Sequence, residues 1–388
     1  MKRPKILFVD DEADLLAGLR LSLRKLRNEW DMVFVEGATK AWPHALEGVD
    51  IVVTDLRMPG MNGADFLKLV QRGFPTTTRI VLSGYANQDM ALEAIGVAHG
   101  WLHKPSTTPA IVEALRRAVR ARAAIEDDRL RRIVFGARAI PSYPRRYAEV
   151  SRLLRDSASS MEMIAESVAC DPGIASKLLH LSNSPLFSRS LPVANVRDAL
   201  CVLGLETFAQ LVLVSEVFEI FDRLRVHAGI EVSWLEERAM RLSMMMKELF
   251  IDPRDTATAA TVGAIHDIGI LLLMQGEGDY DAVQQTVASG TMSRAAAEIA
   301  TYGFCHGEAA AALARAWDLP EALIEALATH ERLTKNPQNV GAMALGLKIS
   351  EDLLEGQGDL DGNVISMIDD VTKQDPDLGR RATRMARR

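Results

Sequence analysis

The chain has 388 residues, of which 48% are hydrophobic and 25% are charged. This length predicts two or three domains, and this composition excludes collagen-like, fibrous and largely disordered proteins. No run is expected to supply the roughly 18 to 20 apolar residues of a membrane span, and the apolar start Ile6–Val9 ends at Asp10. We therefore expect a cytoplasmic protein without membrane contact.

The chain has three widely separated cysteines, Cys170, Cys201 and Cys305. Neither a disulfide framework nor a C-x-x-C metal site is expected from them.

Charge is distributed unevenly along the chain. Residues 1–122 carry a formal charge of +3, whereas the remaining residues carry −10. A domain that binds nucleic acid usually presents basic side chains to the phosphates. The acidic balance of the larger part therefore argues against nucleic acid as the main target.

Residues 1–122 alternate between short apolar runs and helical patterns. The apolar runs predict strands at Lys5–Val9, Met32–Val35, Ile51–Thr54, Ile80–Leu82 and Trp101–His103. Helices are predicted at Ala13–Leu26, Thr39–Leu46, Gly63–Val70 and Gln88–Ala98, and a fifth begins with Thr108 as N-cap and Pro109 as its first residue. Five successive strand–helix units predict an α/β fold with a doubly wound, five-stranded parallel sheet.

The rest of the chain shows helical periodicity without an alternating strand pattern. The fifth helix is expected to continue past its domain, through Leu115 and Leu130, and to stop before Pro141. Beyond Pro144 the pattern predicts an all-α region. The expected division is a first domain at 1–122, a helical connector at 123–140, an all-α domain at 141–335, and a C-terminal helical extension with a basic tail at 336–388.

Polar side chains follow four of the predicted strands. They are Asp10 and Asp11 after the first strand, Asp55 after the third, Ser83 after the fourth and Lys104 after the fifth. Ligands of doubly wound folds bind at this edge of the sheet, so these side chains are expected to converge. Clustered carboxylates repel one another unless a hard cation lies among them, and oxygen ligands suit Mg²⁺. An aspartate beside Mg²⁺ can attack a phosphoryl group, which a nearby lysine and hydroxyl can then bind.

Residues 1 to about 122 resemble the receiver domain of two-component response regulators through Val9–Glu12, Asp55–Gly63, Leu82–Gly84 and His103–Pro105. The resemblance implies a flavodoxin-like fold, a histidine kinase as phosphoryl donor and Asp55 as phosphoacceptor. It also implies a Mg²⁺ site made of Asp10, Asp11, Asp55 and the backbone carbonyl of Arg57. The remaining roles that it implies are a switch hydroxyl at Ser83, a phosphate partner at Lys104 and an aromatic switch residue at Trp101.

A second group of polar residues lies in the predicted all-α region. His266 and Asp267 are adjacent in an apolar stretch, and His306 and His330 follow. Imidazole and carboxylate together suit a hydrolytic metal centre. Residues 135 to 335 resemble the HDOD domain, a branch of the HD phosphohydrolase superfamily that leans away from catalysis, through Ile164–Pro172, Leu181–Ser184, Ala199–Leu205, Trp234, His266–Gly269, Tyr302–His306, Trp317–Pro320 and His330–Glu331.

This second group departs from the catalytic HD pattern. Glu237 stands at the position of the upstream metal-binding histidine. The paired-histidine position holds Thr329, and the terminal aspartate falls near Glu351. We therefore expect a degenerate HD site of Glu237, His266, Asp267, His306 and His330 that holds no cofactor, with weak binding of one divalent metal as the alternative.

The sequence thus predicts a response regulator whose helical domain signals by protein contact rather than by catalysis. The expected partners are a histidine kinase and a protein bound by the HDOD domain, with a cyclic dinucleotide and a second copy of the chain as further candidates. One alternative is a phosphorylation-gated, metal-dependent HD phosphohydrolase. Another is a DNA-binding regulator, because Ile164–Val168 and Asp171–Leu181 could form a helix-turn-helix.

Overall fold

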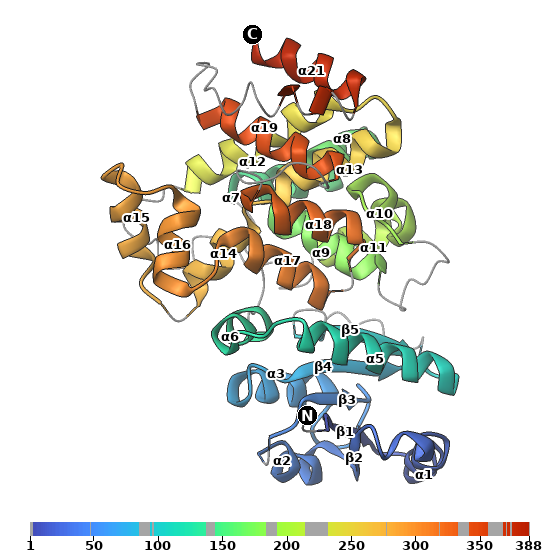
Figure 1. Cartoon of the computed structure of the whole chain (residues 1–388). Helices are drawn as coiled ribbons and strands as arrows, with labels where there is room; N and C mark the ends of the chain where they lie inside the picture. The colour runs from blue at the N-terminus through green and yellow to red at the C-terminus, as the bar shows by residue number, and fades with distance from the viewer. Residues whose placement is uncertain are drawn as a thin grey trace.

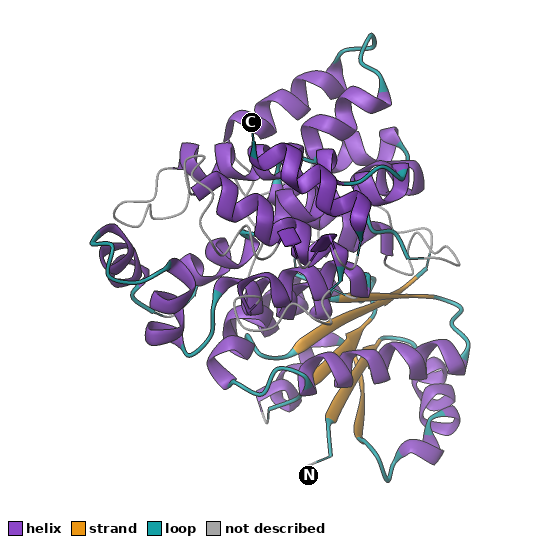
Figure 2. Ribbon diagram, turned by 45° about the horizontal axis from the view of Figure 1, so that its top comes forward, coloured by secondary structure: helices purple, strands orange, loops and turns teal. Residues whose placement is uncertain are grey.

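Figure 1 shows the computed structural model of the protein, which has a sheet-containing part below a larger helical part. Figure 2 shows that the strands are confined to one part of the molecule and that helices make up the other. The structure describes residues 3–46, 48–84, 94, 97–136, 144–183, 192–213, 232–276, 278–317, 319–332, 341–355, 368–369, 371–372 and 375–387.

The five strands form one parallel sheet with the order β2-β1-β3-β4-β5. The central residues of β1, β3, β4 and β5 are buried, which explains why these strands are nearly continuous apolar runs, whereas in the edge strand β2 Met32, Val33 and Phe34 are only partly buried. The predicted fold class of this part is confirmed. The strands are β1 (Lys5–Asp10), β2 (Asp31–Glu36), β3 (Ile51–Thr54), β4 (Thr78–Ser83) and β5 (Gly100–His103).

Helices cover both faces of the sheet. Helices α1 (Ala13–Ser22) and α5 (Thr108–Ala123) pack on one face, and α2 (Ala38–Leu46) and α3 (Gly63–Gly73) pack on the other. The first helix is shorter than predicted, because the chain continues as a 3₁₀ turn at Arg24–Leu26. The N-cap of α5 is Thr107, whose hydroxyl accepts a hydrogen bond from the amide of Ala110, so the prediction of Thr108 was wrong. The helix predicted at Gln88–Ala98 lies mostly outside the described residues.

The connection between the two parts is a broken helix. Helix α5 ends at Ala123, and α6 (Asp128–Gly136) begins five residues later, so the expected continuous helix was wrong. The carboxylate of Asp127 accepts a hydrogen bond from the amide of Leu130, which caps the new helix. Ile125 is buried in the turn. This break lets α6 fold back between the sheet and the helical part.

The described residues beyond the connector are helical, as predicted. Their helices are α7 (Pro144–Arg155), α8 (Met161–Val168), α9 (Pro172–Asn183), α10 (Val196–Leu203), α11 (Leu205–Leu213), α12 (Val232–Leu249), α13 (Pro253–Ile265), α14 (Ile268–Gln275), α15 (Tyr280–Ala288), α16 (Arg294–Tyr302), α17 (His306–Ala316), α18 (Glu321–Thr329), the 3₁₀ turn η4 (His330–Arg332), α19 (Ala342–Glu355) and α21 (Pro376–Ala386).

One helical segment corrects the expectation that no run is apolar enough to span a membrane. By its length and composition alone, the segment Pro253–Gln275 could span a membrane. In the structure, 94% of its most apolar window is buried, against the other helices of the helical part. Burial of this kind is also found in core helices of globular domains, where the apolar surface packs on neighbouring helices.

The two parts share an apolar core. One face of the sheet and the helical interior belong to the same cluster of contacting buried side chains. Figure 1 places α5 and α6 at the boundary, below α17, and both helices contact α17. The buried guanidinium of Arg79 in β4 donates a hydrogen bond of 2.9 Å to the carbonyl of Phe135 in α6. The sheet and the helical part are therefore packed together rather than joined only by a linker.

Candidate functional site

Three aspartates meet at the carboxyl edge of the sheet. Asp10 ends β1, Asp11 follows it, and Asp55 directly follows β3. One carboxylate oxygen from each lies within 4.8 Å of the others. Asp10 and Asp55 are both buried, and burial raises the pKa of Asp10 against the lowering effect of hydrogen bonds from Lys104 and the Glu12 amide. We call the place where Asp10, Asp11 and Asp55 meet the acidic edge. Such closely spaced carboxylate oxygens fit a divalent cation, so the acidic edge meets the requirement for Mg²⁺.

Lys104 joins two of these aspartates. Its Nζ lies 2.7 Å from Asp10 Oδ2 and 2.8 Å from Asp55 Oδ2. Burial acts to lower the pKa of Lys104, but the hydrogen bonds to Asp10 and Asp55 outweigh it and raise the pKa above its ordinary value. The ammonium group is therefore charged, and it can pair with an anionic group added to Asp55.

The loop after Asp55 is held close to the site by a glycine. A Cβ at Gly63 would lie 1.9 Å from the carbonyl oxygen of Asp55, so only glycine fits. Asn62 caps α3 through its side chain, and the amide of Leu56 donates a 2.7 Å hydrogen bond to Asp55 Oδ1. These contacts fix the backbone and one oxygen of Asp55, while its Oδ2 faces Lys104.

The other residues predicted for this site lie on the same edge or close to it. Ser83 ends β4 and is paired in register with His103 of β5. Trp101 in β5 is buried, with 2% of its surface exposed. It lines a cavity of about 60 Å³ at the boundary with the helical part, together with His180 and Trp317. Arg57 follows Asp55 by two residues, and its side chain is exposed.

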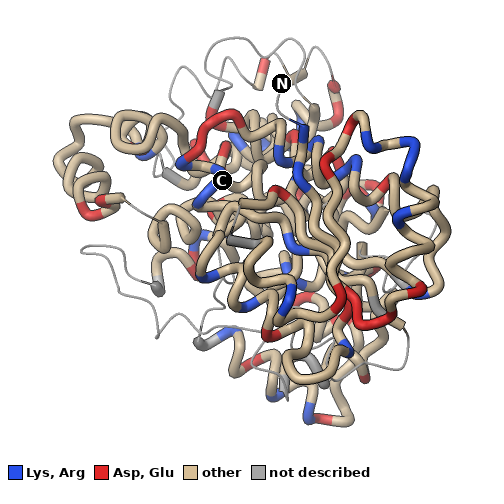
Figure 3. Tube along the Cα trace, turned by 90° about the horizontal axis from the view of Figure 1, so that it is seen from below, with Lys and Arg blue, Asp and Glu red and all other residues tan. Residues whose placement is uncertain are grey.

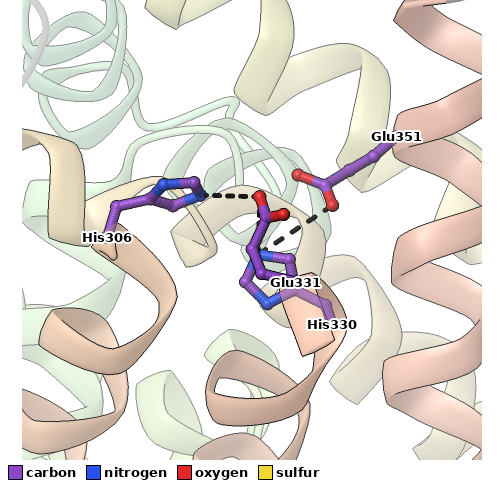
Figure 4. A group of neighbouring side chains, drawn as sticks. All are labelled: His306, His330, Glu331 and Glu351. Carbon is purple, nitrogen blue, oxygen red and sulfur yellow. Dashed lines mark ion pairs between the residues drawn. The ribbon is translucent and has the colours of Figure 1, made fainter. Parts of the chain in front are cut away.

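A second cluster lies inside the helical part. Figure 4 shows His306 and His330 pointing toward the carboxylates of Glu331 and Glu351. His306 Nε2 lies 3.3 Å from Glu331 Oε1, and His330 Nε2 lies 3.9 Å from Glu351 Oε2. One ligand atom from each of the four residues lies within 4.8 Å of the other three.

The histidine rings of this cluster are oriented by partners behind them. Nδ1 of His306 lies 2.7 Å from Glu298 Oε2, and Nδ1 of His330 lies 2.9 Å from the carbonyl of Leu327. Tyr280 donates a hydrogen bond of 2.7 Å to the other oxygen of Glu298. Both histidines therefore direct Nε2 toward the centre of the cluster.

The adjacent His266 and Asp267 lie beside the same centre. His266 Nε2 is 2.9 Å from Asp267 Oδ2 and 3.5 Å from Glu351 Oε1. The guanidinium of Arg238 in α12 donates hydrogen bonds of 2.8 Å to Asp267 Oδ2 and 2.7 Å to Glu351 Oε1. All these side chains are buried.

The inclusion of Glu237 in this cluster was wrong. Glu237 is exposed and forms an ion pair of 3.3 Å with Arg241, one turn along α12. Consecutive residues of a helix point about 100° apart, so the buried position belongs to the next residue, Arg238. Glu298 and Arg238 were missed entirely, because neither lies in a motif and both act through contacts between distant helices.

Burial and charge set the protonation of the cluster. Burial lowers the pKa of His306, but the adjacent Glu298 outweighs it and raises the pKa to about 10. Burial lowers the pKa of His330 to about 4 and raises that of Glu351 to about 7. Burial also acts to raise the pKa of Asp267, but His266 and Arg238 hold it well below its ordinary value. At neutral pH the cluster therefore contains a neutral ring at His330 and a charged carboxylate at Asp267.

Gly269 controls how closely α14 approaches α17. A Cβ at this position would lie 1.8 Å from the carbonyl oxygen of His306. We expect Gly269→Ala to destabilise the protein by about 1–3 kcal/mol, because the two helices must separate. Urea titration followed by circular dichroism measures this as a lower unfolding midpoint.

The matched control is Gly18→Ala in α1, where an added Cβ meets no atom within 4 Å. This change should leave the midpoint unchanged or raise it, because alanine favours a helix over glycine by about 1 kcal/mol. A Gly269→Ala midpoint equal to that of Gly18→Ala would contradict the close packing of α14 on α17.

The helix-turn-helix alternative does not agree with the structure. Every residue from Pro172 to Ser182 in α9 is buried, so this helix cannot enter a DNA groove without unfolding its surroundings. In the part of the chain that Figure 3 describes, lysine and arginine positions are interspersed with acidic ones when the molecule is seen from below. Both observations argue against DNA recognition by this segment.

Two family models match the chain. The response regulator receiver domain matches residues 6–116, and the HDOD domain matches residues 140–333, which is half of the chain. Together they cover the sheet-containing part and most of the helical part.

Two of the curated relatives match about a third of the chain each. A hydrogenase transcriptional regulatory protein, HoxA of Cupriavidus necator, is 32% identical over 123 residues, which cover 31% of this chain and 25% of the relative. The response regulator protein PilR of Pseudomonas aeruginosa is 31% identical over 130 residues, which cover 31% of this chain and 27% of the relative. The chain thus spans about a quarter of the length of these relatives.

A solved structure resembles more of the chain. A virulence factor from Campylobacter jejuni superposes with a TM-score of 0.54 at 17% identity, covering 64% of this chain and 92% of that one. At this identity the likeness concerns the fold alone.

Proposed function

Because the chain belongs to the response regulators that join a receiver domain to an HDOD domain, we propose that phosphorylation of Asp55 controls what the helical domain contacts. A histidine kinase is the proposed phosphoryl donor. The proposed division remains a receiver at 1–122, a connector at 123–140, an HDOD domain at 141–335 and an extension at 336–388.

The chemistry is supported by the arrangement around Asp55. When bound, Mg²⁺ would be held by Asp10, Asp11, Asp55 and the Arg57 carbonyl, and would neutralise the charge of the incoming phosphoryl group. Asp55 Oδ2 is the proposed nucleophile, since Oδ1 accepts the Leu56 amide. The Lys104 ammonium already touches this oxygen and can then pair with the added phosphoryl oxygens.

The observation that carries the proposal is the route from Lys104 to the helical domain. Lys104 lies three positions after Trp101 in the chain, and Trp101 lines the boundary cavity with Trp317 at the end of α17. A displacement of Lys104 toward a phosphoryl group pulls on the end of β5 and so reaches Trp101. Helix α17 begins at His306, which belongs to the buried cluster, so this helix joins the boundary cavity to the cluster.

The output of the helical domain is proposed to be a protein contact. A groove of about 380 Å³ is lined by residues of α8, α10 and α13, and Ile251 at its edge is 72% exposed. Ion pairs of 3.1 Å between Arg197 and Glu162 and of 3.7 Å between Lys247 and Glu166 flank it. An apolar floor with a charged rim is typical of protein–protein interfaces.

Beryllofluoride, which mimics a phosphoryl group on aspartate, tests the coupling. Added with Mg²⁺, it should change hydrogen exchange in α5 and α17, because couplings of about 1–3 kcal/mol shift populations by about 5- to 150-fold. Helix α21, at the far end of the molecule in Figure 1, should exchange as before.

The matched control is the Asp55→Asn variant, which should show no change with beryllofluoride. Identical exchange of α5 and α17 in wild-type protein with and without beryllofluoride would mean that the receiver does not act on the helical domain.

A further inference from the structure

The buried cluster contains two possible sets of metal ligands that share Glu351. The first set, which we call the outer set, consists of His306, His330, Glu331 and Glu351. The second, which we call the inner set, consists of His266, Asp267 and Glu351. The two sets differ in what already occupies their ligand atoms.

The spacing of the outer set fits one transition-metal ion. Bonds of about 2.0–2.2 Å to four tetrahedral ligands place the ligand atoms about 3.3–3.6 Å apart. His306 Nε2 lies 3.3 Å from Glu331 Oε1, and His330 Nε2 lies 3.9 Å from both Glu331 Oε1 and Glu351 Oε2. The other pairs lie within 4.8 Å, so side-chain shifts of up to about 1 Å would complete the geometry.

The atoms of the outer set that face its centre are also unsatisfied. His306 Nε2, His330 Nε2 and Glu351 Oε2 are buried and have no hydrogen-bond partner among the described residues. The same holds for His266 Nε2 and Asp267 Oδ1 of the inner set, so the two sets differ in the presence of Arg238. Unpaired buried polar atoms are costly, and their convergence indicates a ligand. The hydrogen bonds of the two Nδ1 atoms to Glu298 and to the Leu327 carbonyl are the partners that metal-binding histidines usually have.

The inner set is already neutralised by a side chain. Arg238 donates to Asp267 Oδ2 and to Glu351 Oε1, at 2.8 and 2.7 Å. Asp267 Oδ1 has no hydrogen-bond partner among the described residues, but an ion bound there would lie next to a guanidinium that stays charged under all ordinary conditions. Repulsion between the two cations disfavours an ion there.

We infer that the helical domain binds a single divalent transition-metal ion at His306, His330, Glu331 and Glu351, and that Arg238 takes the place of a second ion beside Asp267. Two imidazoles and two carboxylates favour Zn²⁺, Co²⁺, Mn²⁺ or Fe²⁺ over Mg²⁺, which prefers oxygen ligands and retains water. This inference is independent of the phosphorylation proposed for Asp55.

Cobalt provides the test, since its visible absorption reports the ligand geometry. Full-length protein, freed of metal with a chelator and then kept in excess Mg²⁺ to fill the receiver site, is titrated with Co²⁺. We expect four- or five-coordinate absorption bands that saturate at one ion per chain. His306→Ala and Glu331→Gln should each weaken Co²⁺ binding at least about tenfold. Glu237→Gln, an exposed carboxylate of the same domain, should bind as the wild type does.

Absence of these bands in wild-type protein would overturn the inference, and so would bands that persist unchanged in folded His306→Ala. Two ions per wild-type chain would show that Arg238 does not exclude the second ion.

The role of Arg238 is tested by Arg238→His. An imidazole removes the competing cation and offers a ligand, so this variant should bind two Co²⁺ ions and gain more thermal stability from Co²⁺ than the wild type does. Arg238→Lys keeps the positive charge and should bind one ion. One ion in folded Arg238→His, or two in Arg238→Lys, would overturn the role of Arg238. If Arg238→His does not fold, the numbers of Co²⁺ ions bound per chain by Arg238→Lys and by the wild type decide whether Arg238 excludes a second ion.

Discussion

Asp55→Asn is expected to abolish labelling of the protein by radioactive acetyl phosphate in the presence of Mg²⁺. The asparagine amide has nearly the same shape but lacks the nucleophilic carboxylate oxygen that faces Lys104 at 2.8 Å. Labelling of wild-type protein should also stop when a chelator removes Mg²⁺, because the neighbouring carboxylates then repel the incoming phosphoryl group. Radioactivity that stays on filters after acid denaturation and is released by base measures the acyl phosphate.

Asp14→Asn is the matched control for this experiment. Asp14 is an exposed aspartate in the first turn of α1, outside the acidic edge, and its substitution should leave labelling at the wild-type level. If Asp55→Asn protein is labelled as strongly as wild type, another residue is the phosphoacceptor.

Arg238→Ala is expected to lower the stability of the helical domain by about 3–5 kcal/mol. Removing one partner of a buried ion pair leaves the other charge buried without compensation. Arg238 lies between Asp267 and Glu351, which are both buried, so two carboxylates each lose a charged partner at once. Urea unfolding of metal-free protein, followed by circular dichroism, measures the change as a large drop in midpoint.

Arg241→Ala, one turn away on α12, separates this effect from a general loss of helix stability. Arg241 pairs with Glu237, and both side chains are more than half exposed. Exposed pairs contribute about 0–1 kcal/mol, so the midpoint should barely move. Equal effects of the two substitutions would contradict the buried role of Arg238.

Much of the receiver could be predicted because its geometry follows from local patterns. Each apolar run becomes a strand of a parallel sheet, and parallel strands end at one edge. Asp10, Asp55 and Lys104 therefore had to meet, and the structure places Lys104 Nζ within 2.8 Å of both carboxylates. The break after Ala123 was harder to predict, because the apolar pattern continues through it, while the side chain of Asp127 caps the start of a new helix.

The sequence by itself determined the order of the two domains, the parallel sheet and the acidic edge, since these depend on strand periodicity and on which residues follow each strand. Only the tertiary structure decided the content of the buried cluster, which brings together residues of α12, the junction of α13 and α14, α17, η4 and α19. A step of one residue on α12 exchanges exposed Glu237 for buried Arg238, and the packing of the whole helix fixes that phase. The guanidinium of Arg238 therefore lies beside Asp267, where the carboxylate of Glu237 was expected. The helix turns about 100° per residue, and the packing of the neighbouring helices determines which face is buried.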